Sequence, residues 1–452
     1  MTGSALNHFR RSTVLSIIAH SIPVTCFLYE ALLRPGNVVC GKGLSVQSKD
    51  YVSSPRASGS HHAIVLGLLS AVGLFALDMY LPALPTISLD LHADSHAVQA
   101  SLISFFAAMA VSQIIYGPLS DMFGRKQPLY VGLALYILGA IGCALSTDIG
   151  WLVAFRFIQG TGACAGVVIA RAIVRDLHTG AAAAQLMSRL MLVFSISPIL
   201  APLAGSIVTV FGNWRLIFWV MVFAGAVGFV AGRFFLEETR PVAARSESSL
   251  GGALKAYGTL VRDPYYLGLV LMASFGMSSY MIYVANSSFV LIGHYGLSPS
   301  FYSVVFSVNA IGFIGMSQMN GWLARRIGLR KVIRGAVSGY ALTMVALAVL
   351  MAGGVDRLDI MAAFLFAGYA FLGMIVPNAA VLALEHHGRI AGTASAMMGT
   401  VQFMTSALVV GVSGMFMDGT ARPMVAVVAI CSAIVLLLSI AVLKSRHVVA
   451  AE

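Results

Sequence analysis

The ten residues Gly117–Lys126, with the sequence GPLSDMFGRK, decide the fold because a related segment recurs in the second half of the chain. The later segment is Gly321–Lys331, with the sequence GWLARRIGLRK. Both begin with Gly-x-Leu-Ser/Ala, carry a second glycine seven residues on, and end in basic residues. They follow the second and the eighth apolar block of the chain. A repeat at equivalent positions indicates two related halves.

The composition places these halves in a membrane. The 452 residues are 59% hydrophobic and only 10% charged, whereas a soluble domain carries roughly 25% charged residues. The apolar residues form blocks of about 20, the length that a helix needs to cross a bilayer. The predicted spans are 63–82, 97–117, 127–146, 151–171, 186–210, 214–236, 266–292, 300–322, 331–352, 359–383, 391–416 and 424–443.

The basic residues predict the orientation. If the segment before the first span is cytoplasmic, the cytoplasmic loops, the adjoining helix turns and the tail hold 18 Lys and Arg, and the opposite side holds three. The other seven of the 28 are Arg156 and six residues in 1–60. This bias supports both the number of spans and the orientation. We therefore predict an all-α polytopic membrane protein with 12 transmembrane helices in two six-helix halves.

The predicted domains follow from these spans: an N-terminal half at 61–236, a central cytoplasmic loop at 237–264, a C-terminal half at 265–446 and a tail at 447–452. Residues 1–60 do not fit this plan. Their apolar stretch 13–33 is interrupted by His20, Pro23 and Glu30. It is read as an extra span or an interfacial helix, or as the result of a start site assigned too far upstream, which we favour.

Several functional classes are excluded or disfavoured. The net charge of +11 lies in short loops and forms no basic face interleaved with aromatic residues, which argues against nucleic-acid binding. The five cysteines form no CxxC pair, so no metal site is expected. A membrane enzyme would need a cluster of His, Asp or Glu at one membrane face, or a nucleotide-binding loop, and the chain has neither. We expect a transporter without a cofactor rather than an enzyme.

At 62–446 the chain resembles the major facilitator superfamily, whose signature loop matches Gly117–Lys126. The resemblance implies that this loop is a conformational latch. Gly117 and Gly124 are expected to allow a tight turn, Asp121 to face the N-terminus of a neighbouring helix, and Arg125 and Lys126 to stay on the cytoplasmic side. In the second copy, with Gly321 and Gly328, Arg325 replaces the acid.

Further motifs resemble the proton-coupled drug antiporters of this superfamily. They are Arg156–Ala163 (RFIQGTGA), which contains Gly160, and Ser197–Gly205 (SPILAPLAG), which contains Pro198 and Pro202. Proline and glycine should let the fifth helix bend and pack closely against its counterpart in the other half. The segments Leu77–Pro85, Arg171–Asp176, Pro377–Ala380 and Ala391–Ala396 resemble the Bcr/CflA branch, named for bicyclomycin and chloramphenicol resistance.

Asp78 and Arg156 are the charged residues well inside the predicted spans, and such residues are functional candidates. From the rise of a helix, Asp78 lies ~24 Å along a ~30 Å path from the cytoplasm, and Arg156 lies ~8 Å in from the far side. Their matching depths allow an interaction, direct or through a hydrogen-bonded relay. Burial disfavours a charged carboxylate and a neighbouring cation favours it, so relative movement could load and unload a proton on Asp78.

The substrate is expected near the midplane between the halves. Candidate lining residues are polar or amphipathic groups within spans: Tyr280, Tyr283, Asn286, Asn309 and Asn378. Helix-packing hydrogen bonds are the alternative role for each of them.

We expect a monomer in the bacterial inner membrane that exports small amphipathic drugs, bicyclomycin- or chloramphenicol-like or more varied, driven by the proton gradient. Its partners are then the drug, protons and membrane lipid. The alternative is a proton-coupled symporter, or an exporter of an endogenous metabolite.

Overall fold

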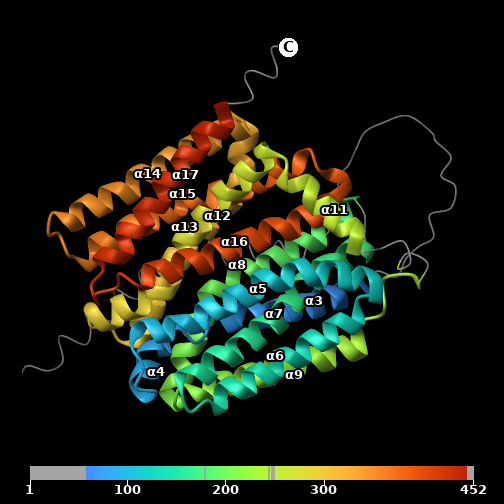
Figure 1. The fold of residues 1–452 in the computed structure, drawn as a ribbon, viewed down its shortest axis with the longest axis horizontal. Helices are drawn as coiled ribbons and strands as arrows, with labels where there is room; N and C mark the ends of the chain where they lie inside the picture. Colours follow the sequence, from blue (N-terminus) through green and yellow to red (C-terminus); the bar gives the residue numbers. More distant parts are fainter. Residues whose placement is uncertain (1–57, 178–179, 243–244, 246–249, 445–452) are drawn as a thin grey trace, which may run out of the picture. The chain divides into compact units, whose positions relative to one another are not determined.

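The computed structural model describes residues 58–177, 180–242, 245 and 250–444. The predicted N-terminal extension and its apolar stretch 13–33, and the tail 447–452, lie outside these ranges apart from Ser58–Ser60. All the regular elements within them are helical, with the labels of Figure 1. The first half contains α3 (Ser58–Asp78), η1 (Leu81–Ala83), α4 (Leu84–Asp90), α5 (Ser95–Phe123), α6 (Lys126–Leu145), α7 (Ile149–Leu177), α8 (Gly180–Phe211) and α9 (Arg215–Phe235).

The second half repeats this arrangement. It contains α12 (Pro264–Ser288), η2 (Phe289–His294), α13 (Pro299–Ile327), α14 (Leu329–Ala352), α15 (Leu358–Glu385), η3 (Gly388–Ile390), α16 (Ala391–Gly414) and α17 (Arg422–Lys444). Among the described residues, twelve helices are long and apolar enough to cross a membrane, and each predicted span falls on one of them. The predicted fold class is therefore confirmed.

Local signals set where several helices begin. The Asp94 side chain accepts a hydrogen bond from the Ala97 amide at 2.6 Å and so caps α5. Asp263 caps α12 in the same way, with Pro264 as the first helical residue. These caps satisfy amide groups that have no partner within their own helix.

The turn between α5 and α6 is repeated between α13 and α14. Gly124 and Gly328 each have a φ of 88°, a left-handed conformation that glycine adopts without steric penalty. Gly117, in contrast, lies inside α5, and Gly321 lies inside α13. The expectation that Gly117 and Gly124 both allow a tight turn is thus wrong for Gly117.

The two halves meet mainly along two pairs of helices, α5 with α16 and α8 with α13, and α5 also contacts α12. Figure 1 shows α8 and α16 between the blue-to-green helices of the first half and the yellow-to-red helices of the second. We call the end of the bundle with Arg125 and Arg330 the basic end, which the charge bias predicts to be cytoplasmic, and the opposite one the far end.

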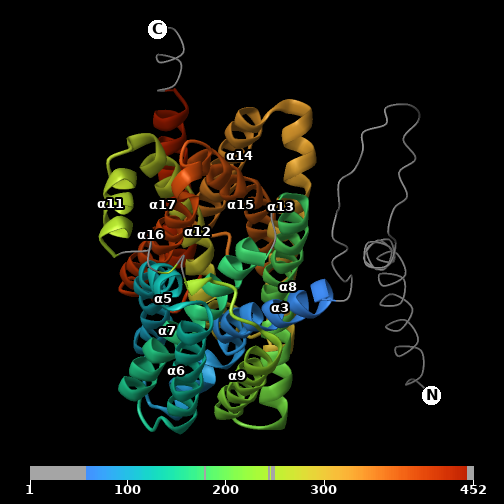
Figure 2. The same ribbon diagram turned by 90° about the vertical axis from the view of Figure 1, so that its right-hand side faces the viewer.

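One helix was not predicted. Residues 237–264 were expected to form a loop, but they contain α11 (Leu250–Val261), which contacts α12 and α16. Figure 2 shows α11 alongside α16. Its 12 residues are too few to cross a bilayer, so a search for spans does not find it.

Candidate transport site

The first transmembrane helix is broken at membrane depth. Helix α3 ends at Asp78, and the short helices η1 and α4 follow, each with a proline in its first turn. Proline lacks an amide hydrogen, so the ladder of helical hydrogen bonds is interrupted here. A side chain at Gly205 of α8 would collide with the carbonyl oxygen of Met79, so glycine is required where α8 meets the break.

Asp78 lies at this break with its carboxylate unpaired. The residue is 5% exposed, and no side-chain hydrogen bond or ion pair involves it within the described ranges. It lies within electrostatic range of the Tyr280 and Tyr302 hydroxyls of the second half. An ionised carboxylate without a partner is costly in such surroundings, which makes Asp78 a candidate for binding and releasing a proton.

Arg156 of α7 reaches the same break from the other side. It is fully buried, and its Nη1 donates to the Ala76 carbonyl at 3.0 Å and to Gln159 Oε1 at 2.7 Å. The guanidinium lies 4.3 Å from the centre of the Tyr80 ring and 4.2 Å from that of Phe105. Its Nε and Nη2 have no hydrogen-bond partner among the described residues. A cation at the C-terminus of α3 is also favoured by the helix dipole.

The structure therefore does not join Asp78 directly to Arg156. The ion pairs among the described side chains do not include them, and Arg156 instead binds the backbone two residues before Asp78. Of the two arrangements considered from the sequence, the direct pair is not formed in this conformation. Arg156 is instead connected to Asp78 through the Ala76 carbonyl at the end of α3.

The five predicted substrate residues are buried rather than open to a cavity. Tyr283 stacks on Phe306, with ring centres 5.4 Å apart, and its hydroxyl accepts a hydrogen bond from Asn309 Nδ2 at 2.9 Å. Tyr280 stacks on Phe313, with ring centres 5.6 Å apart. The structure thus brings Tyr280, Tyr283 and Asn309 into one aromatic cluster, which contacts the boundary between the halves.

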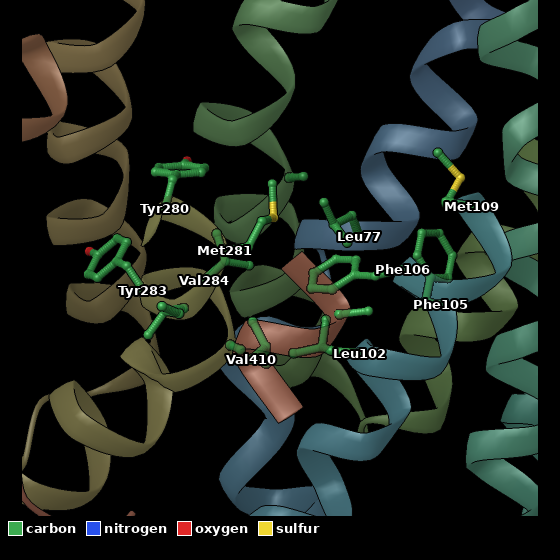
Figure 3. Packing of buried hydrophobic residues seen from close by; sticks show 14 of the residues in the cluster. Leu77, Leu102, Phe105, Phe106, Met109, Tyr280, Met281, Tyr283, Val284 and Val410 are labelled. Atoms are coloured by element: carbon green, nitrogen blue, oxygen red, sulfur yellow. The ribbon is translucent and has the colours of Figure 1, made fainter. Parts of the chain in front are cut away.

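Figure 3 shows this boundary, where Met281, Val284 and Val410 of the second half lie opposite Leu77, Leu102 and Phe106 of the first. The two remaining candidates make amide pairs. Asn378 exchanges two hydrogen bonds with Asn320, both of 2.7 Å. Asn286 accepts a hydrogen bond from Gln99 of the first half at 2.7 Å. Gln99 was not among the candidates, although it is also a polar residue inside a predicted span and could have been selected on that ground.

A cavity of about 600 Å³ lies between the halves at the basic end. It is lined by residues of α5 and α7 on one side and of α11 and α16 on the other. Five of the lining side chains are charged: Asp121, Arg125, Arg175, Asp176 and Arg240. At the far end, in contrast, Ser303 and Ser307 of α13 donate to the Pro202 and Ile199 carbonyls of α8 at 2.9 and 3.0 Å. The described halves are therefore closed at the far end and hollowed at the basic end.

The remaining motif residues bring helices together. Gly160 of α7 lies so close to α5 that a Cβ there would be 2.8 Å from the Phe105 carbonyl oxygen. Pro198 and Pro202 lie inside α8. Next to Pro202, the serine contacts show that α8 packs against α13, the eighth span. The fifth helix was expected to pack against its counterpart in the other half, which is α16, so this expectation is wrong in its partner: α8 meets α13, and α16 meets α5.

The signature loop is held by charges within the first half. Arg125 forms ion pairs with Asp121 at 2.7 Å and with Asp176 at 2.7 Å. Asp121 was expected to face the N-terminus of a neighbouring helix, but its partner is Arg125. Glu238, which the sequence analysis did not select, occupies that role. Its carboxylate accepts hydrogen bonds from the Arg125 and Lys126 amides at the start of α6, at 2.9 and 3.2 Å.

Glu238 has a lowered pKa. Burial opposes the shift, but hydrogen bonds from the backbone amides of Arg125, Arg240 and Lys126 and the charge of Arg245 outweigh it. The carboxylate is therefore held in its charged form at the N-terminus of α6, where the helix dipole favours an anion.

Replacing Glu238 by alanine is expected to destabilise the protein by about 1–2 kcal/mol, the usual effect of losing a helix cap. A lowered folded-state pKa makes this contribution present above the unfolded value, and it is lost as the pH falls through the folded value. Thermal unfolding of the purified protein at pH 7 and at pH 4 measures both effects. Glu237→Ala is the matched control, since the Glu237 side chain makes no hydrogen bond or ion pair among the described residues, in contrast to Glu238. Equal unfolding temperatures for the two variants at pH 7 would contradict the capping role.

The comparisons with known proteins agree with this fold. A sequence model of the family described as Major Facilitator Superfamily matches residues 66–411. The "Uncharacterized MFS-type transporter YdgK" of Bacillus subtilis is 34% identical over 375 residues, which are 82% of this chain and 92% of the relative. The "Bicyclomycin resistance protein homolog" of Haemophilus influenzae is 32% identical over 377 residues, 81% and 92% of the two chains.

A solved structure shows the same architecture. The crystal structure of a D-xylose-proton symporter matches with a TM-score of 0.64 at 14% identity, covering 84% of this chain and 96% of the other. At that identity the match concerns the fold alone.

Proposed function

Because the chain belongs to the Major Facilitator Superfamily, we propose that it exports small amphipathic drug-like molecules from the cytoplasm in exchange for protons. It is a multi-pass membrane protein of a transporter family. Under this proposal it works in the bacterial inner membrane by alternating access, so that one site is open first to one side and then to the other.

The observation that carries the proposal is the unpaired, buried carboxylate of Asp78 at the broken end of α3. A proton taken up from the far side neutralises Asp78 and removes a buried charge, and its release on the basic side restores the charge. Because Arg156 holds the same helix end through the Ala76 carbonyl, a movement of α7 relative to α3 alters the surroundings of Asp78. This is the means by which proton binding and helix movement are linked.

The substrate class rests on the relatives and on the cavity. One relative is named for bicyclomycin resistance, and another, 29% identical over 360 residues, is the "Multidrug resistance protein D" of Escherichia coli. The cavity at the basic end combines charged groups with Val168, Ala172 and Ala396, which suits an amphipathic molecule entering from the cytoplasm. Tyr280, Tyr283, Asn286, Asn309 and Asn378 are proposed to contact it when the halves separate.

Inside-out membrane vesicles that contain the protein test the direction and the coupling. With an acidic lumen, we expect them to accumulate chloramphenicol or bicyclomycin, and we expect the accumulated drug to leave when an uncoupler collapses the gradient. Vesicles without the protein are the control. Proton-driven depletion of the lumen would instead indicate an uptake symporter, and failure to move any member of a broad drug panel would contradict drug export.

A further inference from the structure

We propose that Gln99 and Asn286 form the outer gate of this transporter, the amide pair that holds the far ends of the two halves together while the basic end is open. The proposal rests on the alternating access of the proposed function. It does not depend on proton coupling or on the identity of the drug.

The two amides meet across the boundary between the halves. Gln99 lies near the start of α5 and Asn286 near the end of α12, so both are at the far end. Gln99 Nε2 donates to Asn286 Oδ1 at 2.7 Å, and the residues are 1% and 0% exposed. Asn286 Nδ2 donates to the Ile282 carbonyl of its own helix at 2.9 Å. This second bond orients the amide so that its oxygen points to Gln99.

A glycine makes room for this contact. A Cβ at Gly414, the last residue of α16, would lie 3.0 Å from Gln99 Oε1 and 2.8 Å from His96 Cδ2. At the far end, α5 is therefore enclosed by α12 on one side and by α16 on the other. A larger residue at 414 would displace the Gln99 side chain from its partner.

The Gln99–Asn286 hydrogen bond is formed, but one polar atom of this pair lacks a hydrogen-bond partner among the described residues. Gln99 Oε1 is buried, and no group in the described part of the chain donates a hydrogen bond to it. An unsatisfied buried acceptor is unfavourable, so the closed end is held less firmly than a fully paired amide would hold it. The other two bonds at this end, from Ser303 and Ser307, go to helix carbonyls. Those carbonyls belong to the backbone. Among the hydrogen bonds that the described residues make between the halves at this end, the Gln99–Asn286 bond is therefore the one that joins two side chains.

The Tyr80 hydroxyl hydrogen-bonds to Ser101 Oγ at 3.1 Å, two residues from Gln99 on α5. The Tyr80 ring in turn lies on the Arg156 guanidinium. The gate and the Asp78–Arg156 region are therefore attached to the same stretch of α5, which places the bridge where movement at the helix break can release it.

Distances between spin labels on the full-length protein in lipid test the gate. The five cysteines are replaced, and labels are attached at the exposed residues Leu89 and Phe301 for the far end, or Phe123 and Ile327 for the basic end. For Asn286→Leu we expect the population with a widened far end to rise about fivefold, the effect of losing one hydrogen bond. In the Asn286→Leu protein labelled at Phe123 and Ile327, the distance across the basic end should become shorter.

The control is a second amide pair of the same type. Asn378→Leu breaks the Asn378–Asn320 bonds inside the second half, and we expect it to leave the distribution at the far end unchanged. Unchanged far-end distances in Asn286→Leu, or an equal widening in Asn378→Leu, would overturn the proposal.

A locking variant tests the opposite direction. Gln99→Lys combined with Asn286→Asp replaces the amide bridge by an ion pair, which should hold the far end closed and stop transport. A widened far-end population as large in this folded double variant as in the unchanged protein, measured with the same label pair, would also overturn the gate. Because the distances are measured without drug or gradient, a failure of drug export leaves this result intact, and the two proposals can fail separately.

Discussion

Asp78→Asn is expected to remove proton-driven accumulation of drug while the protein stays folded in the membrane. Asparagine has nearly the same shape but cannot take up and release a proton. One proton moving down ~100 mV supplies ~2.3 kcal/mol, which sustains a drug gradient of about 50-fold for a neutral substrate. In the variant the ratio should fall to about one. Drug concentrations inside and outside sealed vesicles with an imposed gradient give the answer.

The control for Asp78 separates coupling from binding. Exchange of labelled for unlabelled drug without a gradient needs no proton, so Asp78→Asn should retain it. Asp78→Glu keeps a carboxylate and should preserve part of the accumulation. If Asp78→Asn still concentrates drug against the same gradient as the unchanged protein, Asp78 is not the coupling residue.

Arg156→Met is expected to stop coupled transport without a large loss of stability. The lost hydrogen bonds to Ala76 and Gln159 and the two aromatic contacts are each worth about 1–3 kcal/mol. Against this, the substitution also removes the cost of burying a charge that has no ionic partner among the described residues. Because the two effects oppose each other, we expect a smaller loss of stability than the four contacts alone would give, and thermal unfolding of the purified variant measures it.

Coupled transport should respond differently from stability, because the end of α3 that carries Asp78 loses its attachment to α7. We expect accumulation to fall at least about tenfold, the effect of ~1.4 kcal/mol in the positioning of the charge. Arg156→Lys should fail as well, since lysine keeps the charge but not the planar stacking between Tyr80 and Phe105. A Lys variant that transports normally would show that charge alone suffices.

Arg171 offers a matched control for this experiment. It is also an arginine of α7 without an ion pair among the described residues, and it lies over an aromatic ring, with its guanidinium carbon 4.9 Å from the centre of Phe194. It does not contact the break in α3 in any hydrogen bond that the described residues make. Arg171→Met should therefore retain coupled accumulation. An equal loss in both variants would reduce the role of Arg156 to general packing.

The glycines of the repeated motif show what a local sequence pattern can and cannot predict. Gly124 and Gly328 form the same left-handed turn in both halves, which the repeat and the basic tail anticipate because a turn depends on neighbouring residues. Gly117 and Gly321 share the repeat but lie inside helices. A motif shows that a position recurs, whereas the element that it occupies depends on where the helix ends.

The partner of a charged group is harder to predict than its depth. Helix rise placed Asp78 and Arg156 at matching depths, and the structure brings both to the break after α3. Depth is a single coordinate along the membrane, however, and it carries no information on the rotation of each helix. The rotation directs Arg156 to a carbonyl and two rings, and leaves the Asp78 carboxylate without a hydrogen-bond or ionic partner in the described ranges.

Composition and apolar block length were sufficient for the twelve spans, the repeated motif indicated the two halves, and the distribution of basic residues predicts the orientation. These properties follow from the bilayer, which acts on every residue according to its polarity and needs no knowledge of its neighbours. Contacts between helices distant in the chain decided the rest: the Glu238 cap on α6, the attachment of Arg156 to α3 and the Gln99–Asn286 bridge. Each depends on the rotation and crossing of packed helices, which arise only when the whole bundle has assembled.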